Sequence, residues 1–187
     1  ICRLCKICVK KFPDIVKIQP DIVKIQKEEI KHIDKNLWKG IAVYVELTPQ
    51  GIHPVSFELI GEALKLEKCI NQPVYALILG NKLDNSIEEL KYYGLTSIYA
   101  YDNAVLQYYN TDNYLCVVEN FIEHIKPTVV MFGATNLGKA LAPSVAARFK
   151  TGLTADCTQL EIKKNTDLIQ IRPAFGGNIM AQIVTPN

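Results

Sequence analysis

Between residues 41 and 149 the chain alternates short apolar runs with amphipathic stretches, and this alternation restricts the fold more than any other feature. Two of the runs, 41–47 and 74–79, are apolar apart from Glu46, which is typical of strands buried on both faces of a parallel sheet. Further runs follow at 97–101 and 128–132. Strands that alternate with helices at this spacing predict right-handed βαβ units. The sequence therefore predicts an α/β fold of three layers with a Rossmann-like, mostly parallel sheet.

The predicted helices lie between these runs. Ser56 is a suitable N-cap for a helix that ends near residue 69, and helices are also expected at 87–93 and 112–125. Another helix is expected at 136–149, where Pro143 should distort or shorten the first half.

Three further strands are expected at 153–162, 168–172 and 179–184. No helix separates them, and strands joined without a helical crossover pair antiparallel. We therefore expect antiparallel strands at one edge of the sheet.

Residues 1–39 differ from the rest, and we expect them to be a small segment that precedes an α/β domain at 40–187. A pattern that alternates Ile or Val with Lys or Gln occurs twice, at 14–19 and 21–26. Each copy could be a short strand with one apolar face, or the repeat is a local duplication with no structural purpose. The chain starts at Ile1, without a methionine, and we expect it to be a piece of a longer protein.

Composition excludes several classes of function. The net charge is only +2, with lysines interleaved with acids, so a strong nucleic-acid-binding surface is excluded. No apolar run approaches the ~20 residues needed to span a bilayer. Because no signal-peptide pattern is found either, a cytoplasmic location is expected.

Three of the six cysteines, Cys2, Cys5 and Cys8, have the spacing of metal ligands rather than of a disulfide framework. The other three have no near partner in the sequence. No catalytic arrangement of Ser or Cys with His is found. The three histidines lie apart on polar stretches and are expected at the surface; they are His32, His53 and His124. A binding or redox role is therefore favoured over hydrolysis.

Segments 133–135, 151–157 and 172–178 combine small residues with one or two polar groups. We expect each at the C-terminal end of a strand. Open α/β sheets bind ligands in the crevice at that edge, so the three segments are candidates for a binding site. After Gly133, a helix start could offer unpaired amide hydrogens to an anion. Alternatively, Thr135 simply caps the helix.

Arg172 is the most informative residue of the third segment. It is either a solvated charge at the rim of a strand, or a rigid guanidinium that offers a planar fork of donors to a flavin edge or a carboxylate. Pro173 fixes the backbone after it, and Gly176 and Gly177 would let a ligand approach closely. Asp156, expected on the neighbouring strand, is its natural counter-charge.

The three segments, read as 133–148, 151–158 and 172–178, together resemble the N-terminal domain of the electron transfer flavoprotein alpha subunit. The resemblance extends from about residue 40 to the end, and Lys139 stands where an arginine is often found. The amino-acid sequences of the second and third segments resemble the electron-bifurcating or nitrogen-fixation-linked branch of the family more than the mitochondrial one.

This resemblance implies an electron carrier rather than a substrate-converting enzyme, and a possible component of a bifurcating complex. It implies a heterodimer with a beta subunit, FAD at their interface, and an acyl-CoA dehydrogenase-type or other redox partner. Arg172 would point at the reactive nitrogen of that flavin, and Thr154 and Asp156 would line the same cleft with Gly176 and Gly177. The resemblance also implies that the family's second flavin lies mainly in a C-terminal domain, which we expect this chain to lack.

Some alpha subunits of this branch carry a fused ferredoxin-like extension. Cys2, Cys5 and Cys8 match three of the four positions of a ferredoxin cluster run. The fourth cysteine should stand directly before Pro13, where Phe12 is found. Either a ligand upstream of the first residue completes a 4Fe-4S cluster in the intact protein, or the site is degenerate.

The alternative function is a nucleotide-binding α/β module of the universal-stress type, without redox chemistry. A yellow heterodimer with flavin absorbance would support electron transfer, and a colourless homodimer that retains ATP would support the alternative. A domain that only lends its surface to a beta subunit is also compatible with the resemblance.

Overall fold

The computed structural model describes residues 34–185. The predictions for Cys2, Cys5 and Cys8, and for the repeat at 14–26, fall outside these residues. Within this part of the chain, no helix combines the length and apolar character needed to cross a membrane.

Four parallel strands form the central sheet. They are β1 (Ile41–Val45), β4 (Val74–Gly80), β5 (Ser97–Asp102) and β6 (Val129–Met131), in the order β5-β4-β1-β6. β1 pairs with β4 on one side and β6 on the other, and all five of its residues are buried. Parallel strands need cover on both faces, and the predicted mostly parallel sheet is confirmed.

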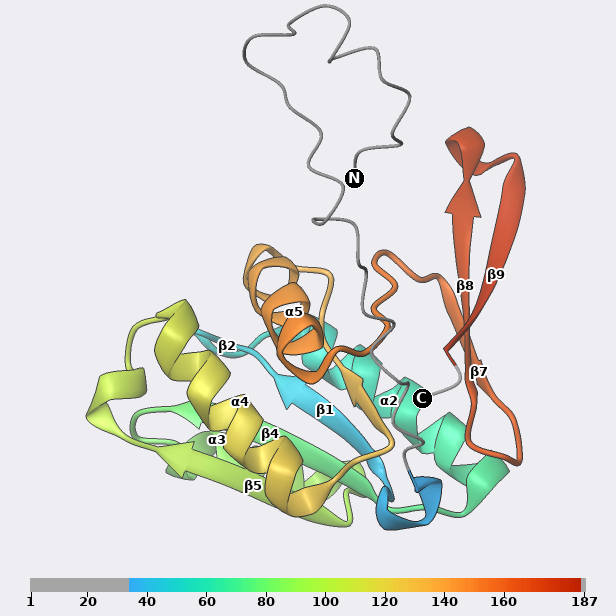
Figure 1. Cartoon of the computed structure of the whole chain (residues 1–187). Helices are drawn as coiled ribbons and strands as arrows, with labels where there is room; N and C mark the ends of the chain where they lie inside the picture. Colours follow the sequence, from blue (N-terminus) through green and yellow to red (C-terminus); the bar gives the residue numbers. More distant parts are fainter. Residues whose placement is uncertain (1–33, 186–187) are drawn as a thin grey trace, which may run out of the picture. The chain divides into compact units, whose positions relative to one another are not determined.

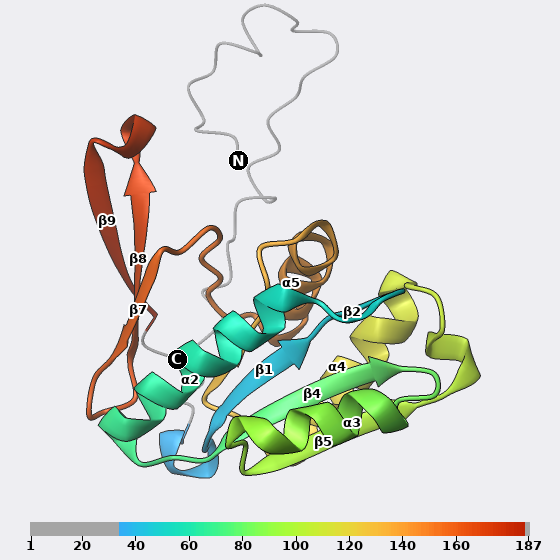
Figure 2. The ribbon, with the colours of Figure 1, turned by 180° about the vertical axis from the view of Figure 1, so that it is seen from behind.

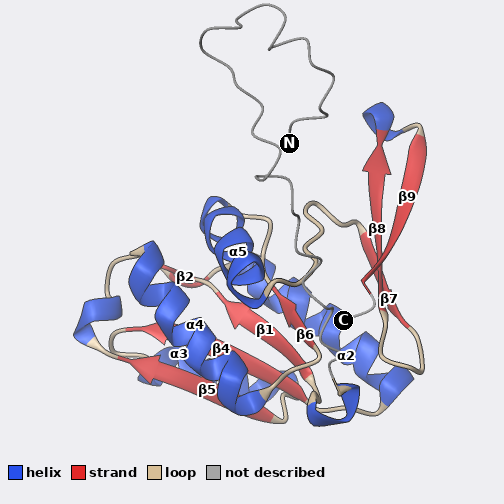
Figure 3. Cartoon of the chain, in the orientation of Figure 1, coloured by secondary structure: helices blue, strands red, loops and turns tan. Residues whose placement is uncertain are grey.

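Four helices supply that cover. They are α2 (Pro54–Ile70), α3 (Asp84–Leu90), α4 (Thr111–Ile125) and α5 (Asn136–Phe149). One apolar core joins α2 and α3 to the sheet, and a second core joins α4 and α5 to its other face. The two opposite views show these layers (Figures 1 and 2), and Figure 3 shows the strands between the helices.

The chain reverses direction across the sheet beside β1. It moves outward from β1 through β4 to β5, and α4 then returns it to β6 on the other side of β1. The switch point therefore lies between the C-terminal ends of β1 and β6, the usual position of a ligand crevice in such a sheet.

The prediction that Ser56 caps the first long helix is wrong. α2 begins at Pro54, and the His53 ring accepts a hydrogen bond from the Val55 N–H at 3.2 Å. Proline suits this position because the first helical N–H has no intrahelical partner. Ser56 is instead fully buried, and its hydroxyl accepts from the Glu46 N–H at 3.0 Å.

Pro143 is expected to distort or shorten the first half of its helix, and shortening does not occur. α5 runs continuously from Asn136 to Phe149. Leu141 and Val145, on either side of the proline, are buried in the core. Their packing keeps the helix intact despite the lost backbone hydrogen bond.

The antiparallel strands form a sheet of their own. They are β7 (Gln159–Ile162), β8 (Leu168–Ala174) and β9 (Ile179–Thr185), in the order β7-β8-β9. Antiparallel pairing is confirmed, but the strands do not join the edge of the parallel sheet. Leu160 and Ile162 pack on the core beneath α2 instead, which places this sheet beside the helix layer. A short hairpin, β2 (Leu47–Thr48) with β3 (Gly51–Ile52), follows β1.

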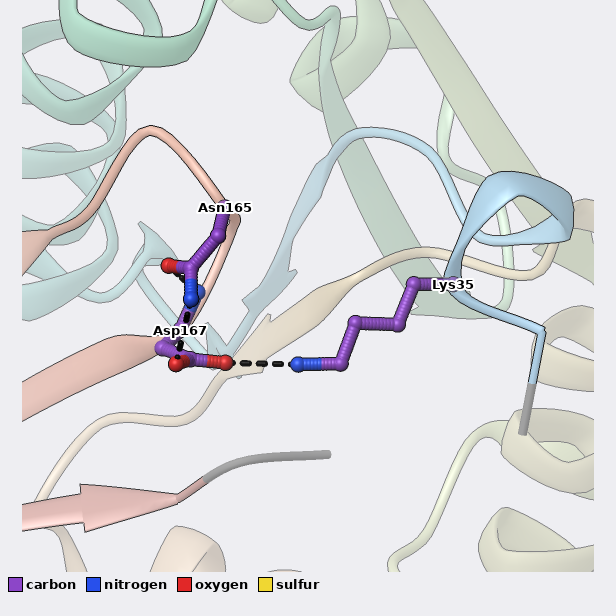
Figure 4. Close-up of polar contacts among 3 residues, drawn as sticks. All are labelled: Lys35, Asn165 and Asp167. Carbon is purple, nitrogen blue, oxygen red and sulfur yellow. Dashed lines mark hydrogen bonds and ion pairs between the residues drawn. The ribbon is translucent and has the colours of Figure 1, made fainter. Parts of the chain in front are cut away.

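An ion pair connects the start of the described chain to the antiparallel sheet (Figure 4). Lys35, in the short helix η2 (Lys35–Leu37), lies 2.6 Å from the Asp167 carboxylate before β8, and the Asn165 amide donates to the other carboxylate oxygen at 2.7 Å. The hydrogen bond from Lys35 is the main reason that the pKa of Asp167 is below its usual range.

Candidate functional site

The switch point is filled by the protein's own side chains. Glu46 follows β1, and its carboxylate accepts a hydrogen bond from the Thr135 hydroxyl. The same hydroxyl accepts from the Gly138 N–H at 3.0 Å and so caps α5. A Cβ on Gly138 would lie 2.0 Å from the Gly133 carbonyl oxygen, so only glycine lets the first turn of α5 pack this closely on the end of β6.

This geometry decides between the two interpretations of the Gly133–Thr135 turn. Glu46 is only 8% exposed, and its carboxylate lies at the positive end of α5. A second anion at this helix start would be repelled by that charge. The turn is therefore a helix cap rather than an anion site.

The second segment, 151–157, lies in a loop between α5 and β7 rather than on a strand. Asp156 has a φ of 56° in this loop, a left-handed conformation that Asp tolerates better than most residues. Its carboxylate lies 2.9 Å from the Lys139 ammonium of α5. The hydrogen bond and charge of Lys139, with a smaller effect of Arg172, hold the pKa of Asp156 below its usual range.

Arg172 lies inside β8, opposite Ala181 of β9, and not at a strand end as the sequence predicts. It is half-buried. Its guanidinium forms no hydrogen bond or ion pair with any residue in the range 34–185. The Thr158 N–H donates to the Ile171 carbonyl at 2.9 Å, which brings the end of the 151–157 loop next to this part of β8. The charge of Arg172 accordingly acts on Asp156 and Cys157.

The thiol of Cys157 lies near the same two charged groups, Asp156 and Arg172. This half-buried thiol donates to the Thr154 carbonyl at 3.4 Å. Burial raises the pKa of the thiol, while the charge of Arg172 lowers it and that of Asp156 raises it. Lys139, Asp156 and Arg172 therefore form a charged cluster of two cations and one anion, with Cys157 beside it.

Lys139 is the member of the charged cluster whose role the sequence does not indicate. It lies 17 positions before Asp156, on a helix that is separated from the loop. Its only signal is that it stands at a motif position where arginine is often found.

The predicted site residues Gly176 and Gly177 have a backbone role. They lie in the turn η5 (Phe175–Gly177) between β8 and β9, with φ values of 71° and 90°. A Cβ on either would meet nothing within 4 Å, so the left-handed backbone, and not crowding, requires glycine.

Thr154 lines an open hollow of about 400 Å³ between the 150–154 loop and residues 183–185 of β9. Gly152 shapes this hollow, because a Cβ there would lie 2.8 Å from the Thr185 side chain. The structure thus brings Thr154, Asp156 and Arg172 into one region, and places Gly176 and Gly177 at the hairpin turn.

Residues 34–185 contain no group of three or more His, Cys, Asp or Glu side chains that could hold a metal ion. The cysteines in this range, Cys69, Cys116 and Cys157, are free thiols. His124 is exposed, as the sequence predicts, whereas His53 is half-buried and caps α2.

Apolar side chains are exposed along β9 and the turn before it. Phe175 is 82% exposed, and β9 pairs only with β8 among the described strands. We call this set the apolar hairpin surface, and it consists of Phe175, Ile179, Met180, Ile183 and Val184. Successive side chains of a strand point to opposite faces, so Ile179 and Ile183 lie on one face of β9, and Met180 and Val184 on the other. Both faces of this hairpin therefore expose apolar groups, which are typical of interaction sites when they gather in number.

Comparisons with known proteins agree with this architecture. The model of the electron transfer flavoprotein domain family matches residues 41–187. The subunit LctC of the lactate dehydrogenase (NAD(+),ferredoxin) of Acetobacterium woodii is 52% identical over 186 residues, which is 100% of this chain and 43% of that protein. The electron transfer flavoprotein subunit alpha of Megasphaera elsdenii is 42% identical over 151 residues, which is 80% of this chain and 45% of that protein.

The protein FixB of Clostridium saccharobutylicum is 40% identical over 150 residues, again 80% of this chain and 45% of that protein. The chain therefore spans less than half the length of these curated relatives. The match to LctC covers the whole chain, whereas each of the other two matches covers 80% of it.

Proposed function

Because the chain belongs to the electron transfer flavoprotein family, we propose that it is the N-terminal part of an alpha subunit that carries electrons between a dehydrogenase and other redox proteins. The family match over 41–187 carries this proposal. We further propose that 40–187 is the alpha-subunit domain and that 1–39 is an extension to it, in a cytoplasmic protein.

The charged cluster fits a flavin edge. Arg172 is half-buried, and within residues 34–185 its guanidinium has no bonded partner, while the nearby carboxylate of Asp156 is bound by Lys139. An unpaired guanidinium is a planar fork of N–H donors, and this geometry suits the carbonyl and ring-nitrogen acceptors at the edge of a flavin ring.

FAD, when bound, supplies the one- and two-electron redox chemistry. Arg172 would donate hydrogen bonds to its edge and stabilise negative charge that develops there on reduction. Thr154, in the adjoining hollow, offers a hydroxyl as a second polar contact.

We also propose that the apolar hairpin surface docks on a beta subunit, with FAD at the interface. Phe175 and the exposed apolar side chains on both faces of β9 would otherwise remain in water. The open edge of β9 also offers unpaired backbone groups to a partner. Several relatives are named as subunits of larger assemblies, which supports a partner here.

A 4Fe-4S cluster held by Cys2, Cys5 and Cys8 remains a proposal for the intact protein. The ligand spacing supports it, and the match to LctC covers the segment concerned.

The alternative nucleotide-binding module receives no support from the switch point. Glu46 fills the start of α5, where the phosphates of a nucleotide would bind.

The test is to produce the full-length alpha subunit together with its beta subunit and to measure flavin per heterodimer after purification. We expect a yellow heterodimer with FAD. A colourless homodimer that retains ATP would overturn the proposal.

A further inference from the structure

One carboxylate in the charged cluster is shared unequally between two cations. Asp156 is bonded to Lys139 at 2.9 Å. Arg172 is close enough to affect the same carboxylate, yet among residues 34–185 its guanidinium has no bonded partner. The Asp156 carboxylate is therefore paired with the Lys139 ammonium, and the donors of the Arg172 guanidinium are left without a partner among these residues.

This choice is not the one that pair geometry alone favours. A guanidinium binds a carboxylate through two parallel N–H donors, whereas an ammonium acts as a point charge. Lys139 nevertheless forms the ion pair with Asp156, because α5 places it next to the 151–157 loop. The left-handed backbone at Asp156 also restricts the positions that its carboxylate can reach.

Stability does not explain the pair. The side chains of Lys139 and Asp156 are 52% and 54% exposed, and ion pairs this exposed contribute little to the free energy of unfolding.

We propose that Lys139 is a positioning residue that holds Asp156 away from Arg172, so that the Arg172 guanidinium keeps its full charge and its donors for the flavin edge. This inference rests on the proposed function of Arg172. Without Lys139, Asp156 would turn to Arg172, neutralise it, and lower the reduction potential of the flavin.

The experiment is a double-mutant cycle in the assembled alpha–beta heterodimer, read out as the flavin midpoint potential by spectroelectrochemical titration. Lys139→Gln should lower the potential, and Asp156→Asn should raise it. In the Asp156→Asn background, Lys139→Gln should have a much smaller effect, because there is no carboxylate left to redirect. Lys139→Arg should keep the wild-type potential, since it keeps the ion pair.

A purely long-range effect of the lysine charge predicts an equal decrease with and without Asp156, and that result would overturn the inference. Lys65→Gln is the matched control, because it breaks another exposed lysine ion pair, that with Glu62 at 2.8 Å, on α2. It should leave the potential unchanged.

Arg172→Ala separates the inference from the proposed function. If Arg172→Ala lowers the potential but Lys139→Gln does not, only the positioning role fails. If neither changes the potential, the flavin role of Arg172 fails, and the inference fails with it.

A second readout does not depend on the flavin. The pKa of the Cys157 thiol responds to both Arg172 and Asp156. In Lys139→Gln, Asp156 paired with Arg172 should offset the positive charge that lowers the pKa of the Cys157 thiol, and so raise the pH at which Cys157 is alkylated, as followed by peptide mass spectrometry. Asp156→Asn should abolish that increase. An alkylation profile identical to wild type in Lys139→Gln would contradict the rearrangement.

Discussion

β1 and β9 have similar aliphatic sequences but opposite environments. All five residues of β1 are buried, whereas no residue of β9 is. β1 lies between two parallel strands with helices on both faces, while β9 pairs only with β8 in the described part of the chain. The same residue types thus form the core in one sheet and an exposed surface in the other, and only the second is available to a partner or cofactor.

The largest expected effect tests whether stability resides in the parallel sheet and its helices. Phe121 of α4 is fully buried and packs edge-on against Tyr99 of β5. Phe121→Ala should lower the free energy of unfolding by about 3–5 kcal/mol, measured by urea denaturation. Ile179→Ala on the exposed β9 should change it by less than about 0.5 kcal/mol. Comparable losses in the two variants would end the distinction between the two sheets.

Gly138 sharpens the comparison at the switch point. Gly138→Ala places a Cβ 2.0 Å from a backbone oxygen, so α5 must shift, at an expected cost of about 1–3 kcal/mol. Gly61→Ala is the control, since a Cβ there meets nothing within 4 Å in the middle of α2. That change should stabilise the protein by about 0.5–1 kcal/mol. Destabilisation by both would show that close packing is not the reason for Gly138.

Arg172 tests the antiparallel sheet, where a substitution should change function and leave the free energy of unfolding nearly unchanged. On the proposed function, Arg172→Ala would remove charged hydrogen bonds to the flavin worth on the order of 1–3 kcal/mol. One kcal/mol corresponds to about 43 mV for a one-electron couple, so the flavin potential of the heterodimer should fall by tens of millivolts or more. An unchanged potential with full flavin occupancy would return Arg172 to a simple surface charge.

The smallest effect concerns the ion pair between Lys35 and Asp167. Because the pKa of Asp167 is lowered in the folded state, the pair stabilises the fold above the unfolded-state pKa of about 3.9. That stabilisation is lost as the pH falls through the lower folded-state pKa. Asp167→Asn should reduce the free energy of unfolding at neutral pH by at most about 1 kcal/mol. It should also weaken the acid dependence of unfolding. An unchanged acid profile would mean that the pair does not form in solution.

Features that depend on neighbouring residues are predictable from this sequence. The helix at 136–149 is predicted with its observed bounds, because Thr135 caps its start and the apolar stripe continues to its end. The helix start at Pro54 is missed, because Ser56 has the chemistry of a cap but is recruited to bond Glu46. A polar residue near a helix start can serve either purpose, and only its burial decides which.

The sequence by itself determined the alternation of strands and helices, the parallel sheet and the antiparallel pairing that follows it, because periodicity and turn chemistry act over a few residues. Tertiary structure alone decided that the antiparallel strands form a separate sheet against α2, and that Arg172 lies inside β8. It also decided that Asp156 is bonded to Lys139 rather than to Arg172. These outcomes depend on which surfaces meet after the chain has folded, and pairs distant in sequence leave no periodic signal.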